Sequence, residues 1–139
     1  MKKIAVVYWS GTGNTEAMAK AIFNGVEAGG GEGSLFVVSE FSESLVGDYD
    51  VVVFGCPAMG AEMLEDGEFE PIFDACKPAL EGKAIALFGS YDWGGGEWMD
   101  IWKEDCSSFA NVVCEPLIVQ NTPDDEALAS CNEFGKGLC

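Results

Sequence analysis

The sequence predicts an α/β protein built on a doubly wound sheet of five parallel strands. Apolar, β-branched runs alternate along the chain with stretches in which apolar residues recur every three or four positions. Such alternation is typical of a parallel sheet covered by crossover helices on both faces. At 139 residues, 48% of them hydrophobic, the chain is long enough to bury its own core, so we expect a single domain over residues 1–139.

Five apolar runs are predicted to be the strands. Three of them are apolar almost throughout, which indicates strands that are covered on both faces. Pro116 lies in the last run, and because proline has no amide hydrogen, we expect that run at an edge of the sheet. The glycine-rich segment 27–34 is predicted to be a turn. The predicted strands cover residues 3–9, 34–39, 50–55, 84–89 and 112–120.

Four helices are predicted between and after these strands. Two of them cover about 66–76, which is acidic at its start as the helix dipole favours, and about 124–138. The other two are recognised by an apolar face with helical spacing. The residues of that face are Met18, Ala21, Ile22 and Val26 in the first helix, and Trp98, Ile101, Trp102, Cys106 and Phe109 in the third.

The net charge of −17 narrows the possible partners. It arises from seven basic and 24 acidic residues with no histidine, and it would repel nucleic acid and anionic membranes. The segment 62–74, with six acids and no base, could steer a basic partner and disfavour added negative charge nearby, or it could simply be solvated. We therefore expect no nucleic acid and no membrane among the partners.

The six cysteines do not have the spacing of a metal site. No two of them stand two residues apart, as in iron–sulfur, zinc or thioredoxin-like motifs, so we expect no metal. The N-terminal apolar run is too short for a signal peptide, and no run is long enough to span a membrane. These observations favour a cytoplasmic protein with reduced thiols.

The segment "SGTGNT" at residues 10–15 is a candidate phosphate site. It lies between the first strand and the first helix, where backbone amides and the helix dipole favour an anion. It matches neither the Walker pattern nor the dinucleotide fingerprint, because the required lysine and third glycine are absent. A terminal phosphate monoester could bind there, although a plain helix cap is the alternative. The hydrogen-bonding side chains are Ser10, Thr12, Asn14 and Thr15.

Two further loops follow the third and fourth strands. In "GCPAMGAEM" (55–63), Met59 could cover a flat ring and Gly60 could bring the backbone close to it, although Met59 could also be a core residue. In "GSYDWGGGEW" (89–98), Tyr91 and Trp93 fall in a glycine-rich loop, where an aromatic side chain can stack on a ligand. The carboxyl ends of parallel strands meet at one edge, so the three loops predict a ligand with a phosphate and a planar ring.

The motifs "YWSGTGNTE", "GCPAMGAE" and "LFGSYDWGGG", in this order and spacing, resemble the short-chain flavodoxins of the clostridial type along the whole chain. The resemblance implies a flavodoxin-like sheet of order 2-1-3-4-5 and non-covalent flavin mononucleotide (FMN) as cofactor. It also implies a monomeric, low-potential carrier of single electrons between redox proteins, not an enzyme, with basic reductases or oxidoreductases as partners.

The resemblance further implies the site residues. The phosphate would be held by residues 10–15, Met59 and Trp93 would cover the two faces of the ring, and Asn121 would lie near the ribityl chain. Gly60 would offer its carbonyl to the protonated flavin N5 after a peptide flip, and Glu62 would accept a hydrogen bond from the N3 edge. The implied cofactor-binding residues are Ser10, Gly11, Thr12, Gly13, Asn14, Thr15, Pro57, Ala58, Met59, Gly60, Ala61, Glu62, Ser90, Tyr91, Trp93, Gly94 and Asn121.

Three other functions are possible for this fold class. A response-regulator receiver is excluded, because the strands that would end in aspartate and lysine end in Trp9, Gly55 and Gln120. A quinone or azo reductase would also bind FMN but would need a substrate pocket. A docking module without a cofactor would leave Met59 and Trp93 without a role. The last two functions therefore remain as alternatives to the electron carrier.

Overall fold

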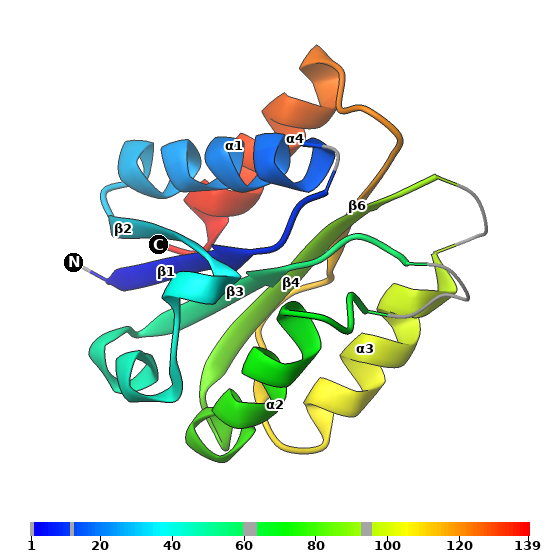
Figure 1. Cartoon of the computed structure of the whole chain (residues 1–139). Coiled ribbons are helices and arrows are strands. Elements are labelled where there is room, and N and C mark those ends of the chain that lie inside the picture. The colour runs from blue at the N-terminus through cyan, green and yellow to red at the C-terminus, as the bar shows by residue number, and fades with distance from the viewer. Residues whose placement is uncertain (1, 12, 60–63, 93–95) are drawn as a thin grey trace.

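The computed structural model describes residues 2–11, 13–59, 64–92 and 96–139 and contains a parallel sheet between two layers of helices (Figure 1). The sheet order β2-β1-β3-β4-β5, with β6 also paired to β4, is the predicted order. The strands are β1 (Lys3–Tyr8), β2 (Glu32–Val37), β3 (Val51–Gly55), β4 (Ala84–Tyr91), β5 (Asn111–Val112) and β6 (Leu117–Gln120). The helices are α1 (Asn14–Ala28), α2 (Phe69–Leu80), α3 (Glu97–Ser107) and α4 (Asp125–Gly137), with short 3₁₀ helices η1 (Val38–Glu40) and η2 (Glu43–Asp48).

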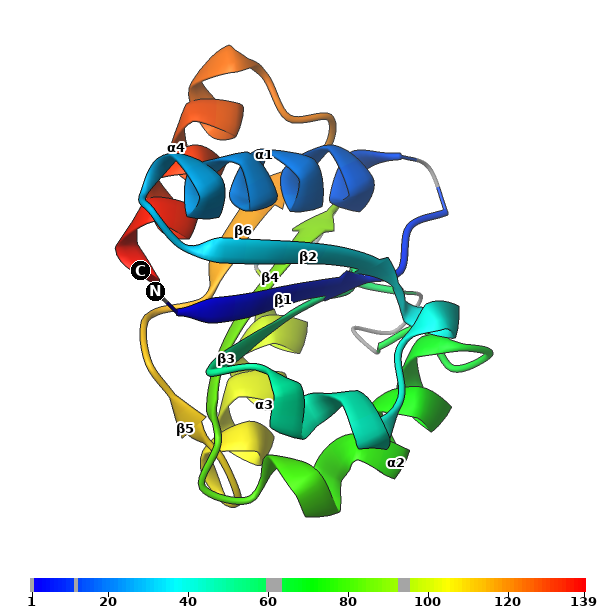
Figure 2. The same ribbon diagram turned by 90° about the vertical axis from the view of Figure 1, so that its left-hand side faces the viewer.

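Each face of the sheet is buried under one pair of helices. Figure 2 shows α1 and α4 on one side of the sheet and α2 and α3 on the other. In β1, Ile4 and Val6 belong to the core under α1 and α4, whereas Ala5 and Val7 belong to the core under α2 and α3. All four are fully buried, so the strand is apolar throughout, as predicted for a strand covered on both faces.

The second strand begins earlier and ends earlier than predicted. The sequence predicts a turn at Glu32 and Gly33, but these residues pair with Lys3 and Ile4 of β1. Backbone pairing in this register outweighs the weak strand propensity of glycine. The predicted strand residues Val38 and Ser39 instead belong to η1, and neither 3₁₀ helix was predicted.

The last predicted strand is two short strands. Both β5 and β6 pair with β4, but Pro116 lies between them and not within a strand. The interruption agrees with the missing amide hydrogen of proline. Strand β6 pairs with the carboxyl end of β4. The chain after β6 therefore lies at the edge of the sheet where the candidate loops lie.

Two helices differ in detail from the prediction. Helix α2 lies about three residues later than predicted, because its buried side chains, from Phe69 to Leu80, follow a helical spacing. In α3, Trp98 and Trp102 are buried as predicted, but Ile101 was wrongly placed on the apolar face and is 63% exposed. None of the described helices is both long and apolar enough to cross a lipid bilayer.

Helices α1 and α4 pack closely through glycines. A Cβ atom at Gly135 of α4 would lie 2.1 Å from the carbonyl oxygen of Ile22, and one at Gly25 of α1 would lie 2.0 Å from the carbonyl oxygen of Asn132. Real Cβ atoms do not approach backbone oxygen so closely, so the two helix backbones can lie this near only with glycine at both positions.

We predict that Gly135→Ala lowers the free energy of unfolding by about 1–3 kcal/mol, because the added methyl group forces the two helices apart. Gly137→Ala is the control in the same helix: a Cβ there meets no atom within 4 Å. It should be neutral or stabilise the protein by up to about 1 kcal/mol, through helix propensity. Urea denaturation measures both, and equal stability of the two variants would contradict the close contact.

Candidate functional site: a cofactor cavity at the carboxyl edge of the sheet

The first candidate loop forms an open helix N-terminus. The side-chain oxygen of Ser10 accepts a hydrogen bond from the amide of Gly13 at 3.0 Å. Gly13 is the cap residue of α1 and has a left-handed φ of 95°, a conformation that favours glycine. Glycine has no side chain that could accept from the amides of the first turn, so the plain side-chain cap is not formed at this residue. These amides remain donors for an anion.

Two predicted site residues meet beneath this loop. Thr15 and Ser90 are buried, and their hydroxyl oxygens lie 2.8 Å apart in a hydrogen bond between α1 and β4. Ser90 was predicted in the loop after the fourth strand, but it lies within β4, paired with Val119. The pair joins the start of α1 to the sheet.

The second loop runs along the end of β4. The amide of Cys56 donates to the carbonyl of Phe88 at 3.2 Å, and the amide of Ala58 donates to the carbonyl of Ser90 at 2.9 Å. These bonds continue the pairing of β3 with β4 beyond Gly55. They bring Pro57 and Met59 next to the predicted residues of β4.

The loop after β4 begins later than the predicted third loop (89–98). Tyr91, predicted to lie in that loop, is the last residue of β4, so the loop begins at Asp92. The Tyr91 ring is half-buried and lies 5.5 Å from the ring of Trp98, measured between ring centroids. The amide of Asn121 donates to the carbonyl of Tyr91 at 2.7 Å. Asn121 itself is exposed, with a left-handed φ of 60°.

Residues of all three loops line one cavity, of about 120 Å³ in the described residues. It is lined by Trp9, Gly11, Asn14, Pro57, Met59, Ser90, Tyr91 and Asp92. Six of these eight were predicted as site residues. The predicted residues Thr12, Gly60, Ala61, Glu62, Trp93 and Gly94 lie outside the described residues.

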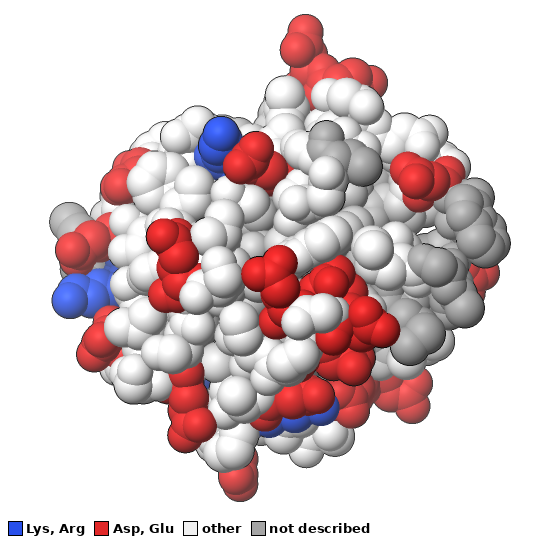
Figure 3. All heavy atoms as spheres, in the orientation of Figure 1, with Lys and Arg blue, Asp and Glu red and all other residues white. Residues whose placement is uncertain are grey.

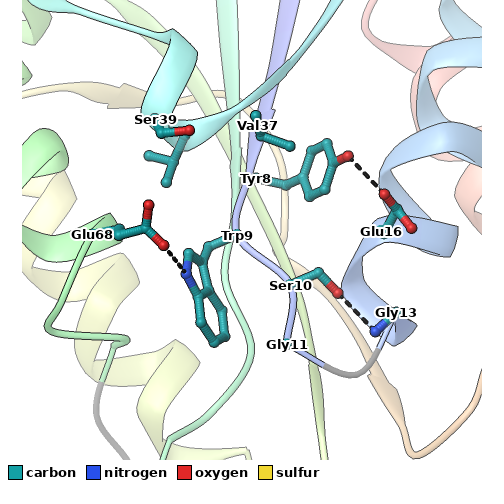
Figure 4. A pocket seen from close by; sticks show the side chains of 10 residues that line it. Tyr8, Trp9, Ser10, Gly11, Gly13, Glu16, Val37, Ser39 and Glu68 are labelled. Carbon is teal, nitrogen blue, oxygen red and sulfur yellow. Dashed lines mark hydrogen bonds between the residues drawn. The ribbon is translucent and has the colours of Figure 1, made fainter.

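Trp9 also lines the cavity, although the sequence motifs do not predict it as a site residue. Its indole ring lies against Gly11, at whose Cα an added Cβ would be 3.0 Å from the ring. Its indole nitrogen donates to the carboxylate of Glu68 at 3.2 Å (Figure 4). The position of this tryptophan directly after β1 and before the glycine loop was the available signal.

A second and larger cavity, of about 420 Å³, lies on the other side of Trp9. Its lining includes Glu16 and Glu68, and the hydroxyl of Tyr8 donates to Glu16 at 3.1 Å (Figure 4). Burial, this hydrogen bond and the nearby negative charge raise the pKa of Tyr8. Ser10, Gly11 and Gly13 of the candidate loop also line this cavity, and the Lys20 ammonium lies 4.0 Å from the Glu16 carboxylate. The carboxylates of Glu16 and Glu68 disfavour an anion beside them, so within this cavity a phosphate is favoured at the backbone amides of the loop.

Glu65 has a structural role at the start of α2. Its carboxylate accepts hydrogen bonds from the amides of Gly67, Glu68 and Phe69 at 2.7–2.8 Å. Burial raises its pKa, but the three amide hydrogen bonds lower it by more, so the net pKa lies below the usual value. The acidic segment therefore contains both structural and freely exposed carboxylates, since Asp66 is exposed.

Comparison with known proteins decides the family. The family model described as flavodoxin matches residues 6–135. The flavodoxin of Clostridium beijerinckii is 47% identical over 134 residues, 96% of each chain, and that of Megasphaera elsdenii is 44% identical over 133 residues, also 96% of each. The chain belongs to the flavodoxin family.

Solved structures give the same result. The solution structure of two-electron reduced Megasphaera elsdenii flavodoxin superposes with a TM-score of 0.87 at 42% identity, covering 96% of this chain and 98% of that one. As a flavodoxin, the protein is an FMN-binding electron carrier and not an enzyme. The reductase and the cofactor-free module are therefore not favoured.

The described residues of this flavodoxin fit FMN. The open amides of α1 and the Asn14 side chain suit a phosphate, and the cavity wall formed by Met59, Tyr91 and Trp9 suits a flat apolar ring. Among the described residues, no group of three or more His, Cys, Asp or Glu could hold a metal ion.

We predict that Glu65→Ala lowers the free energy of unfolding by about 1 kcal/mol at neutral pH, as loss of a helix-capping carboxylate does. A lowered folded-state pKa stabilises the protein above the unfolded-state pKa, near 4.5, and this contribution is lost as the pH falls through the folded-state pKa. The difference from wild type should therefore shrink toward about pH 3. Urea denaturation at several pH values tests this, with exposed Asp66→Ala as the control that should change little. A pH-independent loss would argue against the capping role.

Proposed function

We propose that FMN lies in the cavity at the carboxyl ends of β1, β3 and β4. The observation that carries the proposal is that all three candidate loops line this one cavity. Ligands of open parallel sheets bind at this edge. When bound, FMN supplies the redox chemistry, and the protein supplies its orientation and its electrostatic environment.

In this placement, residues 10–15 hold the phosphate. Ser10, Thr12 and Asn14 offer side-chain hydrogen bonds, Gly11 and Gly13 allow the backbone to approach closely, and the amides of the first turn of α1 complete the site. Thr15 is already bonded to Ser90, so we assign it to holding the loop on the sheet. The helix dipole provides the positive end, since residues 6–19 contain no lysine or arginine.

The ring lies between the second and third loops in this proposal. Met59 covers one face and Trp93 the other, with Pro57, Ala58, Ala61, Ser90, Tyr91 and Gly94 around them. Gly60 offers its carbonyl to N5, Glu62 accepts from N3, and Asn121 lies near the ribityl chain. The described members of this set support the assignment, because Pro57, Met59, Ser90 and Tyr91 line the same cavity.

We further propose that the chain works as a cytoplasmic, single-domain monomer with basic redox partners. The net charge of −17 supports basic partners. Figure 3 shows one face of the molecule, over which acidic side chains are spread with few lysines among them. Asp66 is exposed and Glu70 half-buried, and both stand close in sequence to Glu68, whose partner Trp9 lines the cavity. A basic partner attracted here would approach the site.

We predict that Asn14→Ala weakens FMN binding at least about tenfold, because a hydrogen bond to a charged group is lost. Riboflavin, which has no phosphate, should bind both proteins equally. Asn24→Ala, on the exposed side of the same helix, is the control and should leave both affinities unchanged. Fluorescence titration of each of the three apoproteins with each flavin measures the six dissociation constants. Equal loss of both flavins would remove Asn14 from the phosphate site.

We predict that Asp66→Asn combined with Glu70→Gln raises the lower midpoint potential by on the order of tens of millivolts, because fewer carboxylates oppose the added electron. The variant should also reduce a basic cytochrome c more slowly, with a weaker dependence on ionic strength. Glu65 and Glu68 are left intact because they hold backbone amides and Trp9.

The matched control for this pair is Glu27→Gln with Glu32→Gln. Both residues are exposed, at the end of α1 and the start of β2, on the opposite edge of the sheet. The control changes the net charge by the same amount, so it should leave the potential and most of the rate unchanged. If both pairs act alike, overall charge and not the acidic segment is responsible.

A further inference from the structure

The thiol of Cys56 makes two hydrogen bonds that have no part in the proposed binding of FMN. It directly follows β3 and is fully buried. Its sulfur accepts a hydrogen bond from the amide of Glu65 at 3.3 Å and donates one to the carbonyl of Pro57 at 3.5 Å. A single thiol therefore bonds to Pro57 and to Glu65, the first and last residues of the segment 57–65, which we call the ring loop.

The two arms of the ring loop are held in different ways. The first arm is bonded to β4 through the amides of Cys56 and Ala58. The second arm reaches Glu65, whose carboxylate is bonded to the start of α2. The hydrogen bond from Glu65 to the sulfur of Cys56 joins this arm to the end of β3. The thiol thus connects the sheet to α2 across the base of the ring loop.

The thiol suits this role because it stays protonated. Burial raises the pKa of Cys56 to about 12, although the amide hydrogen bond from Glu65 lowers it. A protonated thiol can donate to Pro57 while its lone pairs accept from Glu65, whereas a thiolate could not donate. Cys56 is therefore not a nucleophile at neutral pH.

We propose that Cys56 is a positioning residue of this flavodoxin: its thiol joins the two arms of the ring loop and so sets where Met59 stands at the flavin ring. The inference rests on the proposed placement of FMN in the cavity that Met59 lines. It concerns the ring end of the cofactor only, since Cys56 contacts no residue of the phosphate loop in the bonds described.

The test compares Cys56→Ala with Cys106→Ala. Cys106 is also fully buried in the same core, and its pKa is also raised to about 12, but it lies in α3. Each variant removes one fully buried sulfur atom from this core, so both should lose stability to a similar degree. Only the first should affect the ring loop.

The first readout is hydrogen exchange of the Glu65 amide in the FMN-loaded protein, followed by nuclear magnetic resonance. Cys56→Ala should accelerate it about tenfold, because the amide loses its acceptor, whereas Cys106→Ala should leave it unchanged. The second readout is affinity: Cys56→Ala should weaken FMN and riboflavin by the same factor, about fivefold. Cys56→Ser keeps a donor and an acceptor and should recover most of both losses.

Each other result contradicts the inference. An unchanged Glu65 amide in Cys56→Ala would overturn the joining of the arms and leave the placement of FMN standing. A faster amide with unchanged affinity for both flavins would make the thiol merely structural. Weaker FMN with unchanged riboflavin would overturn the placement of the ring, and with it the inference. If Cys56→Ala does not fold, Cys56→Ser must still show an altered Glu65 amide or flavin affinity, and wild-type values for both would reject the role.

Discussion

The site depends on backbone hydrogen bonds that continue the sheet beyond the ends of its strands. The amide of Trp9 bonds to the carbonyl of Gly55, that of Cys56 to Phe88, and that of Ala58 to Ser90. Loops that leave parallel strands usually diverge, but here the first residues of two loops are kept in register with their neighbours. Because of this pairing, Gly11, Met59 and Tyr91 line a common cavity although they are far apart in the sequence. The side-chain bond from Thr15 to Ser90 then fixes the start of α1 on the same frame.

The same arrangement of loops decides which charged and polar groups surround the candidate phosphate site. Residues 6–19 contain no lysine or arginine, and the donors that the structure offers to an anion there are the amides at the open end of α1. Two carboxylates of the second cavity have hydrogen-bond donors: Glu16 accepts from Tyr8, and Glu68 accepts from Trp9. The second cavity is thus lined both by these bonded carboxylates and by Ser10, Gly11 and Gly13 of the loop, whose backbone amides are the more favourable place for an anion.

The start of α2 connects the two halves of the site. Glu65 caps the helix and bonds to Cys56, while Glu68 holds Trp9, which backs Gly11. In sequence these residues look like a solvated acidic run, and some of them are. Their separate roles follow from which backbone amides and which indole nitrogen lie within reach, and spacing alone does not reveal this.

The alternating apolar runs of the sequence predicted a parallel sheet covered by helices on both faces, because such patterns depend on neighbours in the chain. The family resemblance carried by three local motifs implied the sheet order, the cofactor and six of the eight residues that line the cavity. The tertiary structure decided what depends on distant neighbours. Ser90 and Tyr91 belong to β4 because β6 pairs with them, Ile101 is exposed because α3 turns another face inward, and Pro116 separates two strands. Trp9 and Cys56 show the limit most clearly. Each acquires its role from a contact with the start of α2, at Glu68 and Glu65 respectively, which only folding brings within hydrogen-bonding distance.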